Sequence, residues 1–289
     1  MNFCSRVSLA SREAFAGTGV RGQAYVFLPV PKRYWHDREM NRQWASPEEL
    51  EAIRAARAGG VVTRLYAPPD ENGGEPALVL AYTDEAAPGV AFDRLLAVAA
   101  RRWPIDATGQ PRLAICTHGT RDRCCAKFGY AAYQKAQALF EAEASAFAPI
   151  QCSHLGGDRF AATGVFLPSG SMYAHLDEID LSAVCVAEAA GKIQPAAYRG
   201  RVYEPPLAQL ARAALARAGL VNDASAPIAV EGHGPGEVEA RLGGGRYRIR
   251  LHAAEVEFGS CHAMASAKLS RGRRLVIESA ERIDETAPR

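Results

Sequence analysis

The sequence predicts an α/β protein with three regions. Along residues 1–200, short apolar runs of strand length alternate with segments that have helical periodicity. Residues beyond 200 carry one Ala/Leu-rich helix, followed by short alternating runs between glycines, which is typical of antiparallel strands. We therefore expect an N-terminal α/β unit over 1–106, a central α/β domain over 107–200, and a C-terminal helix with antiparallel strands over 201–289.

The N-terminal unit has one well-marked helix start. Ser46-Pro47-Glu48-Glu49 places Ser at the N-cap, Pro in the first turn and Glu where it completes a capping box. This helix should end at Gly59-Gly60, and residues 105–111 are interpreted as a linker. Strands are expected at 23–30, 61–66 and 77–82, and a second helix at 91–102.

The central domain has the order strand, helix, strand, hairpin, helix, which is a thioredoxin-like order. The N-terminal unit resembles this order but lacks a clear fourth strand, so only topology suggests a duplication. In the central domain, strands are expected at 112–116, 149–153, 163–167 and 171–176, and helices at 128–146 and 181–191. In the last region we expect a helix at 207–218 and strands at 228–231, 237–242, 247–253 and 275–279.

Composition excludes several classes of protein. Hydrophobic residues make up 48% of the 289 residues, which is enough for a sizeable core, and the formal charge of +2 favours neither nucleic acid nor a membrane surface as partner. No apolar run reaches the ~18 residues of a transmembrane helix, and no secretory signal is apparent. Seven cysteines, two of them adjacent, suit a reducing cytoplasm and metal or redox work better than a disulfide framework.

The stretch from Cys116 to Arg159 carries the residues best suited to chemistry. Cys116 ends an apolar strand, and Cys125 lies near the start of the following helix, where backbone N–H groups and the helix dipole stabilise a thiolate. Two thiolates placed in this way can bind one metal atom of a cluster.

A second pair of possible ligands follows at the end of the next strand. His154 and Asp158 flank Leu155-Gly156-Gly157, and two glycines let the backbone turn sharply beside a bulky group. Imidazole and carboxylate both bind metals, although they differ in hardness. Cys152, two residues before His154, is the rival for a fourth ligand, although strand alternation places it deeper in the core.

The spacing Cys116-x8-Cys125, followed by His154-Leu-Gly-Gly-Asp158-Arg-Phe-Ala, resembles the sucrase/ferredoxin-like family of thioredoxin-fold [2Fe–2S] proteins. The family pattern is C-x8-C followed by H-x-G-G-H-x-F-A, and the resemblance extends to 3–5 and 167–170. It implies a thioredoxin-like ferredoxin domain in which Cys116 and Cys125 hold one iron and His154 the other. Asp158 stands where the family has the second His, and it is the fourth ligand unless Cys152 takes that place.

Several nearby residues are expected to support this site without binding iron. We expect His118 to be a hydrogen-bonding neighbour. The basic residues should offset the negative charge of a cluster and dock an acidic redox partner, such as a reductase; they are Arg121, Arg123, Lys127 and Arg159. Cys124 should point elsewhere. Cys4, Cys185 and Cys261 are interpreted as isolated, with Cys185 in the core.

These observations favour a soluble one-electron carrier over a catalyst, because no pattern singles out a catalytic residue. Two alternatives remain at this stage. One is a cluster-free thioredoxin-like protein with a binding or thiol-redox role, and the other is a zinc or mononuclear metal site that uses the same residues. A cytoplasmic protein with an unidentified redox partner is expected.

Overall fold

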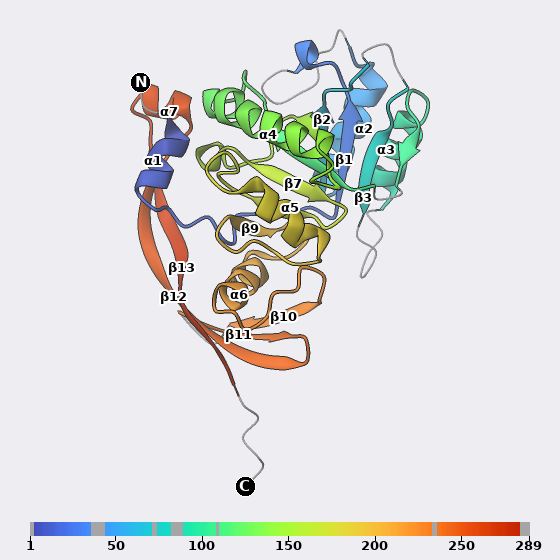
Figure 1. Cartoon of the computed structure of the whole chain (residues 1–289). Helices are drawn as coiled ribbons and strands as arrows, with labels where there is room; N and C mark the ends of the chain where they lie inside the picture. The colour runs from blue at the N-terminus through green and yellow to red at the C-terminus, as the bar shows by residue number, and fades with distance from the viewer. Residues whose placement is uncertain are drawn as a thin grey trace.

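The chain folds around a nine-stranded mixed sheet, with a separate four-stranded antiparallel sheet near the C-terminus (Figure 1). The computed structural model describes residues 3–35, 44–70, 74–81, 89–107, 110–232 and 236–283, so Tyr82, the last residue of one expected strand, lies outside them. The α/β class expected from the sequence is confirmed. None of the described helices is long and apolar enough to cross a membrane.

The large sheet has the order β4-β3-β1-β2-β6-β5-β7-β8-β9. Its first four strands in chain order belong to the N-terminal unit and the others to the central region. They are β1 (Ala24–Pro29), β2 (Val61–Tyr66), β3 (Ala77–Ala81), β4 (Ile105–Asp106), β5 (Arg112–Cys116), β6 (Ala148–Cys152), β7 (Gly164–Leu167), β8 (Ser171–Tyr173) and β9 (Tyr198–Arg201).

Helices connect and cover these strands. The capping box expected at Ser46 is present, because its side chain accepts from the Glu49 amide while the Glu49 carboxylate accepts from the Ser46 amide. The helices are α1 (Cys4–Ala10), α2 (Pro47–Ala58), α3 (Val90–Ala99), α4 (Tyr130–Glu141), α5 (Leu181–Ala189), α6 (Pro206–Arg217) and α7 (Cys261–Ala265). Three shorter turns are η1 (Lys32–Tyr34), the π-helical η2 (Cys125–Gly129) and η3 (Asp158–Phe160).

The two halves of the large sheet repeat one arrangement. β1 pairs parallel with β2 and antiparallel with β3, just as β5 pairs parallel with β6 and antiparallel with β7. The halves meet where β2 pairs antiparallel with β6 at Tyr66 and Cys152. The linker expected over 105–111 is wrong at its start: Ile105–Asp106 form β4, parallel to β3, and give the N-terminal unit its fourth strand.

The C-terminal sheet contains a hairpin much longer than the sequence pattern predicts. Its strands are β10 (Ile228–Gly232), β11 (Glu237–Leu242), β12 (Gly245–Phe258) and β13 (Ser270–Arg282). The expected strands at 247–253 and 275–279 cover only parts of β12 and β13, because the outer half of the hairpin is largely exposed and polar. Cross-strand ion pairs line that half, with Arg271 Nε 3.2 Å from Glu257 and Arg273 Nε 3.3 Å from Glu255.

The end of this hairpin returns to the start of the chain. α7 lies between β12 and β13 and sits beside α1 (Figure 1), where the Cys4 amide donates to Cys261 Sγ at 3.4 Å. The sequence pattern predicted neither α1 nor α7. Thiols from α1, from the residue before η2 and from α7 belong to one hydrophobic cluster that also holds Cys116 and Cys125. A second cluster fills the N-terminal unit, on the face covered by α2 and α3.

Candidate metal centre

Cys116 and Cys125 are positioned by a close contact between a strand and a helix. Cys116 is the last residue of the buried strand β5, and Cys125 is the first of the π-helical turn η2. π-Helical turns are rare and frequently occur at functional sites. Gly129 ends this turn directly over Cys116, because a Cβ atom there would lie 2.0 Å from the Cys116 carbonyl oxygen. Only glycine allows the helix to approach so closely, and the two thiols meet as a result.

The structure brings the four expected ligands together. The Cys116 thiol hydrogen-bonds with both Cys125 and His154. Cys125 Sγ lies 3.8 Å from Asp158 Oδ1, and His154 Nδ1 lies 2.9 Å from the same oxygen. Two sulfurs, one imidazole and one carboxylate thus converge where β5 ends, β6 ends and η3 begins.

These contacts shift the pKa values of the two thiols in opposite directions. The hydrogen bond from Cys125 and the nearby His154 lower the pKa of Cys116 well below its usual range, despite burial. The same hydrogen bond, together with burial, raises the pKa of Cys125. Burial lowers the pKa of His154, but Asp158 and Cys116 outweigh it and raise that pKa to about 9. The site therefore favours one thiolate beside a protonated imidazole when no metal is bound.

The donor set fits a metal group. His154 Nδ1 is buried and has no well-aligned hydrogen bond, although it stands close to the carboxylate of Asp158. Two thiols and an imidazole are also the ligands that zinc and iron–sulfur groups prefer.

Cys152 lies next to this group but in the core. It pairs in register with Cys116 on the neighbouring strand and is fully buried. Burial is the main reason that its pKa is raised well above the usual value, and the charge of Cys116 adds to it. This thiol therefore stays protonated in the absence of metal.

A buried arginine shapes the loop between His154 and Asp158. Gly156 and Gly157 have φ angles of +83° and +74°, in the region that favours glycine. The Arg199 Nη1 donates to the Gly156 carbonyl at 3.0 Å, and its Nη2 donates to the Thr18 carbonyl at 2.7 Å. A Cβ at Gly157 would lie 2.7 Å from that Nη2. No sequence pattern indicates this role for Arg199, because only the fold brings β9 against the loop.

The residues expected around the site differ in what they contact. His118 accepts a hydrogen bond at Nδ1 from the His154 amide, at 3.3 Å. Arg121 Nε lies 3.9 Å from Asp158 Oδ2, whereas Arg159 pairs with Glu13 at 2.6 Å. The ammonium group of Lys127 lies 4.8 Å from the centre of the Phe3 ring, and Arg123 is exposed beside a cleft.

Cys124 points away from Cys125 into a second group that the sequence did not reveal. Cys4, Cys124, Cys261 and Asp122 are all buried, and their ligand atoms all lie within 4.8 Å of one another. The interpretation of Cys4 and Cys261 as isolated is therefore wrong. Their separation of 257 positions hides the contact, and the only signals were the odd cysteine count and the adjacent Cys124-Cys125. This part of the protein thus contains a possible metal-binding group of three thiols and a carboxylate.

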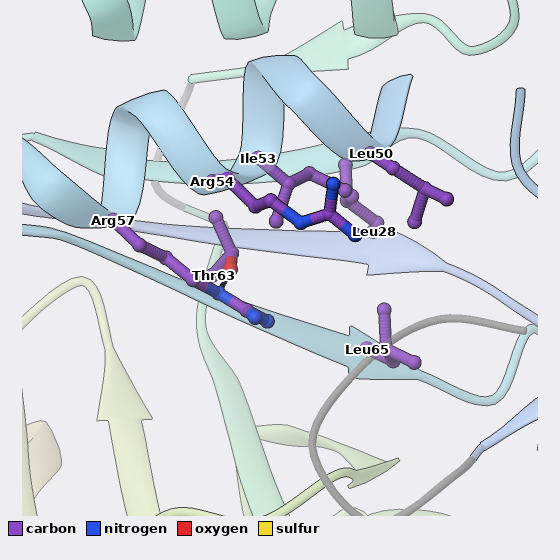
Figure 2. A pocket seen from close by; sticks show the side chains of 7 residues that line it. All are labelled: Leu28, Leu50, Ile53, Arg54, Arg57, Thr63 and Leu65. Carbon is purple, nitrogen blue, oxygen red and sulfur yellow. Dashed lines mark hydrogen bonds between the residues drawn. The ribbon is translucent and has the colours of Figure 1, made fainter. Parts of the chain in front are cut away.

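Two pockets differ in their relation to the thiols. A cleft of about 300 Å³ lies between residues 119–123 and α7, and Asp122 and Cys261 border it. The pocket in Figure 2 lies between α2 and strands β1 and β2, with only about 10 Å³, which is room for one water molecule. Its side chains are Leu28, Leu50, Ile53, Arg54, Arg57, Thr63 and Leu65. It offers no room for a substrate.

Comparison with known proteins gives one match. Neither curated proteins nor solved structures show a match to the chain. The family model described as sucrase/ferredoxin-like matches residues 16–200, which is more than half of the chain and includes Cys116, Cys125, His154 and Asp158. The chain therefore belongs to the sucrase/ferredoxin-like family.

Proposed function

We propose that this protein is a one-electron carrier that binds a [2Fe–2S] cluster. Cys116 and Cys125 would hold one iron, and His154 and Asp158 the other. The observation that carries the proposal is the convergence of two thiols, an imidazole and a carboxylate at one point, with Cys125 Sγ and His154 Nδ1 3.8 and 2.9 Å from Asp158 Oδ1. Membership of the sucrase/ferredoxin-like family supports it further.

A bound cluster of this kind supplies reversible uptake of a single electron. The protein's part is to set the charge around that electron. An imidazole ligand in place of a thiolate removes one negative charge beside the iron, which raises the reduction potential. Arg121, which faces Asp158, acts in the same direction.

A surface for the redox partner would lie beside the same loop. Arg123 and Lys127 are exposed there, and neither forms part of the four-ligand group. A patch of positive charge near an electron carrier favours encounter with an acidic partner, and salt weakens that encounter. We propose a redox partner protein with an acidic face, such as a reductase.

The test starts with the 289-residue chain prepared without oxygen, then reconstituted with iron and sulfide. We expect absorption bands of a [2Fe–2S] cluster, with iron and acid-labile sulfide in equal amounts. Cys116→Ser and Cys125→Ser should lose both. The matched control is Cys185→Ser, because Cys185 is also buried but lies on α5. A colourless wild-type protein after reconstitution would exclude the carrier.

A cluster-free thiol-redox protein is the second candidate. The hydrogen bond between the two thiols and the thiolate character of Cys116 favour it, since a thiolate is the reactive form of cysteine. Asp158, in place of the family's second His, also pairs directly with His154 without any metal. In this case the reconstituted protein stays colourless, and a mild oxidant links Cys116 to Cys125 in a disulfide.

A single metal ion at the same four residues is the remaining alternative. The purified protein would then contain metal but no acid-labile sulfide, and Cys116→Ser would lose the metal.

A further inference from the structure

Three cysteines from distant parts of the chain meet at one point. Cys4 belongs to α1, Cys124 precedes η2, and Cys261 opens α7. Their side chains are at most 2% exposed. The three Sγ atoms form a nearly equilateral triangle, with 3.5 Å from Cys4 to Cys124, 3.3 Å from Cys124 to Cys261 and 3.6 Å from Cys261 to Cys4. Such a cluster of thiols can bind a metal ion of its own, separate from the group around Cys116.

We propose that Cys4, Cys124, Cys261 and Asp122 form a tetrahedral zinc site. A Zn–S bond of ~2.3 Å in tetrahedral geometry places two thiolate sulfurs ~3.8 Å apart, close to the observed triangle. A multi-iron cluster would bind the thiolates to different irons and spread the sulfurs farther apart. The compact triangle therefore fits a single ion.

Asp122 is placed to complete the coordination. Its Oδ1 and Oδ2 lie 3.8 and 3.9 Å from Cys4 Sγ. Oδ1 accepts from the Cys124 amide and Oδ2 from the Cys261 amide, both at 2.8 Å. These bonds fix the carboxylate between two of the thiols and leave each oxygen a lone pair for the ion. Three thiolates with one oxygen make a closed four-ligand set, as in structural zinc sites.

Hydrogen-bond donors surround the sulfurs. The Ser5 hydroxyl and amide donate to Cys124 Sγ at 3.3 and 3.5 Å, and the Cys4 amide donates to Cys261 Sγ at 3.4 Å. Such donors offset the charge of thiolates around a divalent cation and orient them. Soft sulfur ligands favour zinc over magnesium or calcium, and the cleft that borders Asp122 and Cys261 gives the ion a path inward.

A zinc ion at this site would hold distant segments of the chain together. Zinc would fasten α1 and the end of the β12–β13 hairpin to the helical turn that carries Cys124, which adjoins Cys125 of the proposed cluster site. Cys4 and Cys261 lie outside residues 16–200, so two of the three thiols are not part of the family match. The zinc site therefore does not rest on the proposed electron-carrier function.

The first measurement is the zinc content of the full chain, produced with added zinc. We expect one zinc ion per chain in the wild type and in the control Cys185→Ser. The double variant Cys116→Ser/Cys125→Ser should also keep one zinc ion. Cys4→Ser and Cys261→Ser should lose it. Zinc that disappears with the Cys116 and Cys125 substitutions but persists in Cys4→Ser would overturn the assignment.

A second measurement needs only the wild type, in case the Cys4 variant fails to fold. Thiol alkylation is mapped by mass spectrometry before and after a strong chelator removes metal. Cys4, Cys124 and Cys261 should be protected first and then react, while Cys185 changes little. A disulfide among the three, or equal reactivity with and without the chelator, overturns the proposal.

Asp122→Asn tests the fourth ligand in the same protein. The amide keeps the size of the side chain but loses the anionic oxygen. The affinity for zinc, measured against a competing chelator, should fall at least about tenfold. Loss of a residue that only hydrogen-bonds to a metal ligand already costs roughly 10–100-fold in affinity, and loss of a ligand should cost no less. Unchanged retention would overturn the four-ligand set.

Discussion

Gly129→Ala should destabilise the protein, although alanine normally strengthens a helix. Gly129 has a φ of −64° and ψ of −41°, so alanine is acceptable to its backbone. The difficulty is spatial, because the new Cβ would lie 2.0 Å from the Cys116 carbonyl oxygen, and real Cβ atoms essentially never come closer than 3.0 Å. The helix and β5 must separate by about 1 Å, and neither can rotate the obstructing backbone atom away.

The magnitude follows from two opposing effects. Forcing extra volume into a packed interior costs ~1–3 kcal/mol, and a backbone obstacle places this case near ~3 kcal/mol. Alanine in place of glycine in a helix returns ~1 kcal/mol. We therefore expect a net loss of ~2 kcal/mol in the free energy of unfolding, which lowers the Tm by roughly 3 °C in a chain of this size, at ~2.1 cal/mol/K of unfolding entropy per residue.

Chemical denaturation followed by circular dichroism measures this loss. The control is Gly59→Ala, because Gly59 has a φ of −81° and its nearest contact for a Cβ is an ordinary 3.4 Å from Ala56 O. It should change stability by less than ~1 kcal/mol. A Gly129→Ala protein as stable as the wild type would refute the close contact between η2 and Cys116. If the cluster is present, the same variant should also bind less iron.

Three further predictions concern the site loop and a buried acid. Asp158→His should retain iron and sulfide to lower pH than the wild type, because imidazole is the softer ligand. Asp158→Ala should lose both. Equal loss of iron and sulfide in all three proteins would exclude Asp158 as a ligand. Arg199→Met should lower the free energy of unfolding by ~3 kcal/mol in denaturant melts, because the buried carbonyls of Thr18 and Gly156 lose their donors. Burial raises the pKa of Glu188, so its contribution to stability is complete below the unfolded pKa of ~4.3 and is lost as pH rises through the folded value. Stability of Glu188→Gln, measured over a pH series, should fall less across this range than that of the wild type; parallel curves would contradict the assignment.

Local patterns made the first group of site residues predictable. An apolar run ending at Cys116, a helix beginning near Cys125 and a double-glycine turn after His154 are all short-range signals. The capping box at Ser46 and the bounds of β2 and β11 follow from equally local chemistry. In each case the residues that decide the structure are neighbours in the chain.

The parts that were missed depend on contacts between distant residues. Cys4 and Cys261 gain meaning only when the hairpin brings α7 back to α1, and no periodicity records such a meeting. Arg199 looks like an ordinary basic residue, yet it is 1% exposed because the fold packs its own strand, β9, against Thr18 and the glycine turn after His154. β4 is only two residues long, and a proline precedes it, so it was interpreted as a linker. The π-helical turn at Cys125 also has the residues of a normal helix.

The long hairpin of β12 and β13 carries its own protection against aggregation. β13 is the outermost strand of its sheet, and such an edge can recruit a strand of another molecule through its backbone groups. Charged side chains recur along the exposed half, where Arg271 and Arg273 of β13 face Glu257 and Glu255 of β12. Stacking a second copy there would crowd like charges and cost their hydration. A ribbon that reaches far enough to bring Cys261 back to Cys4 can thus remain exposed along much of its length without becoming a template for fibres.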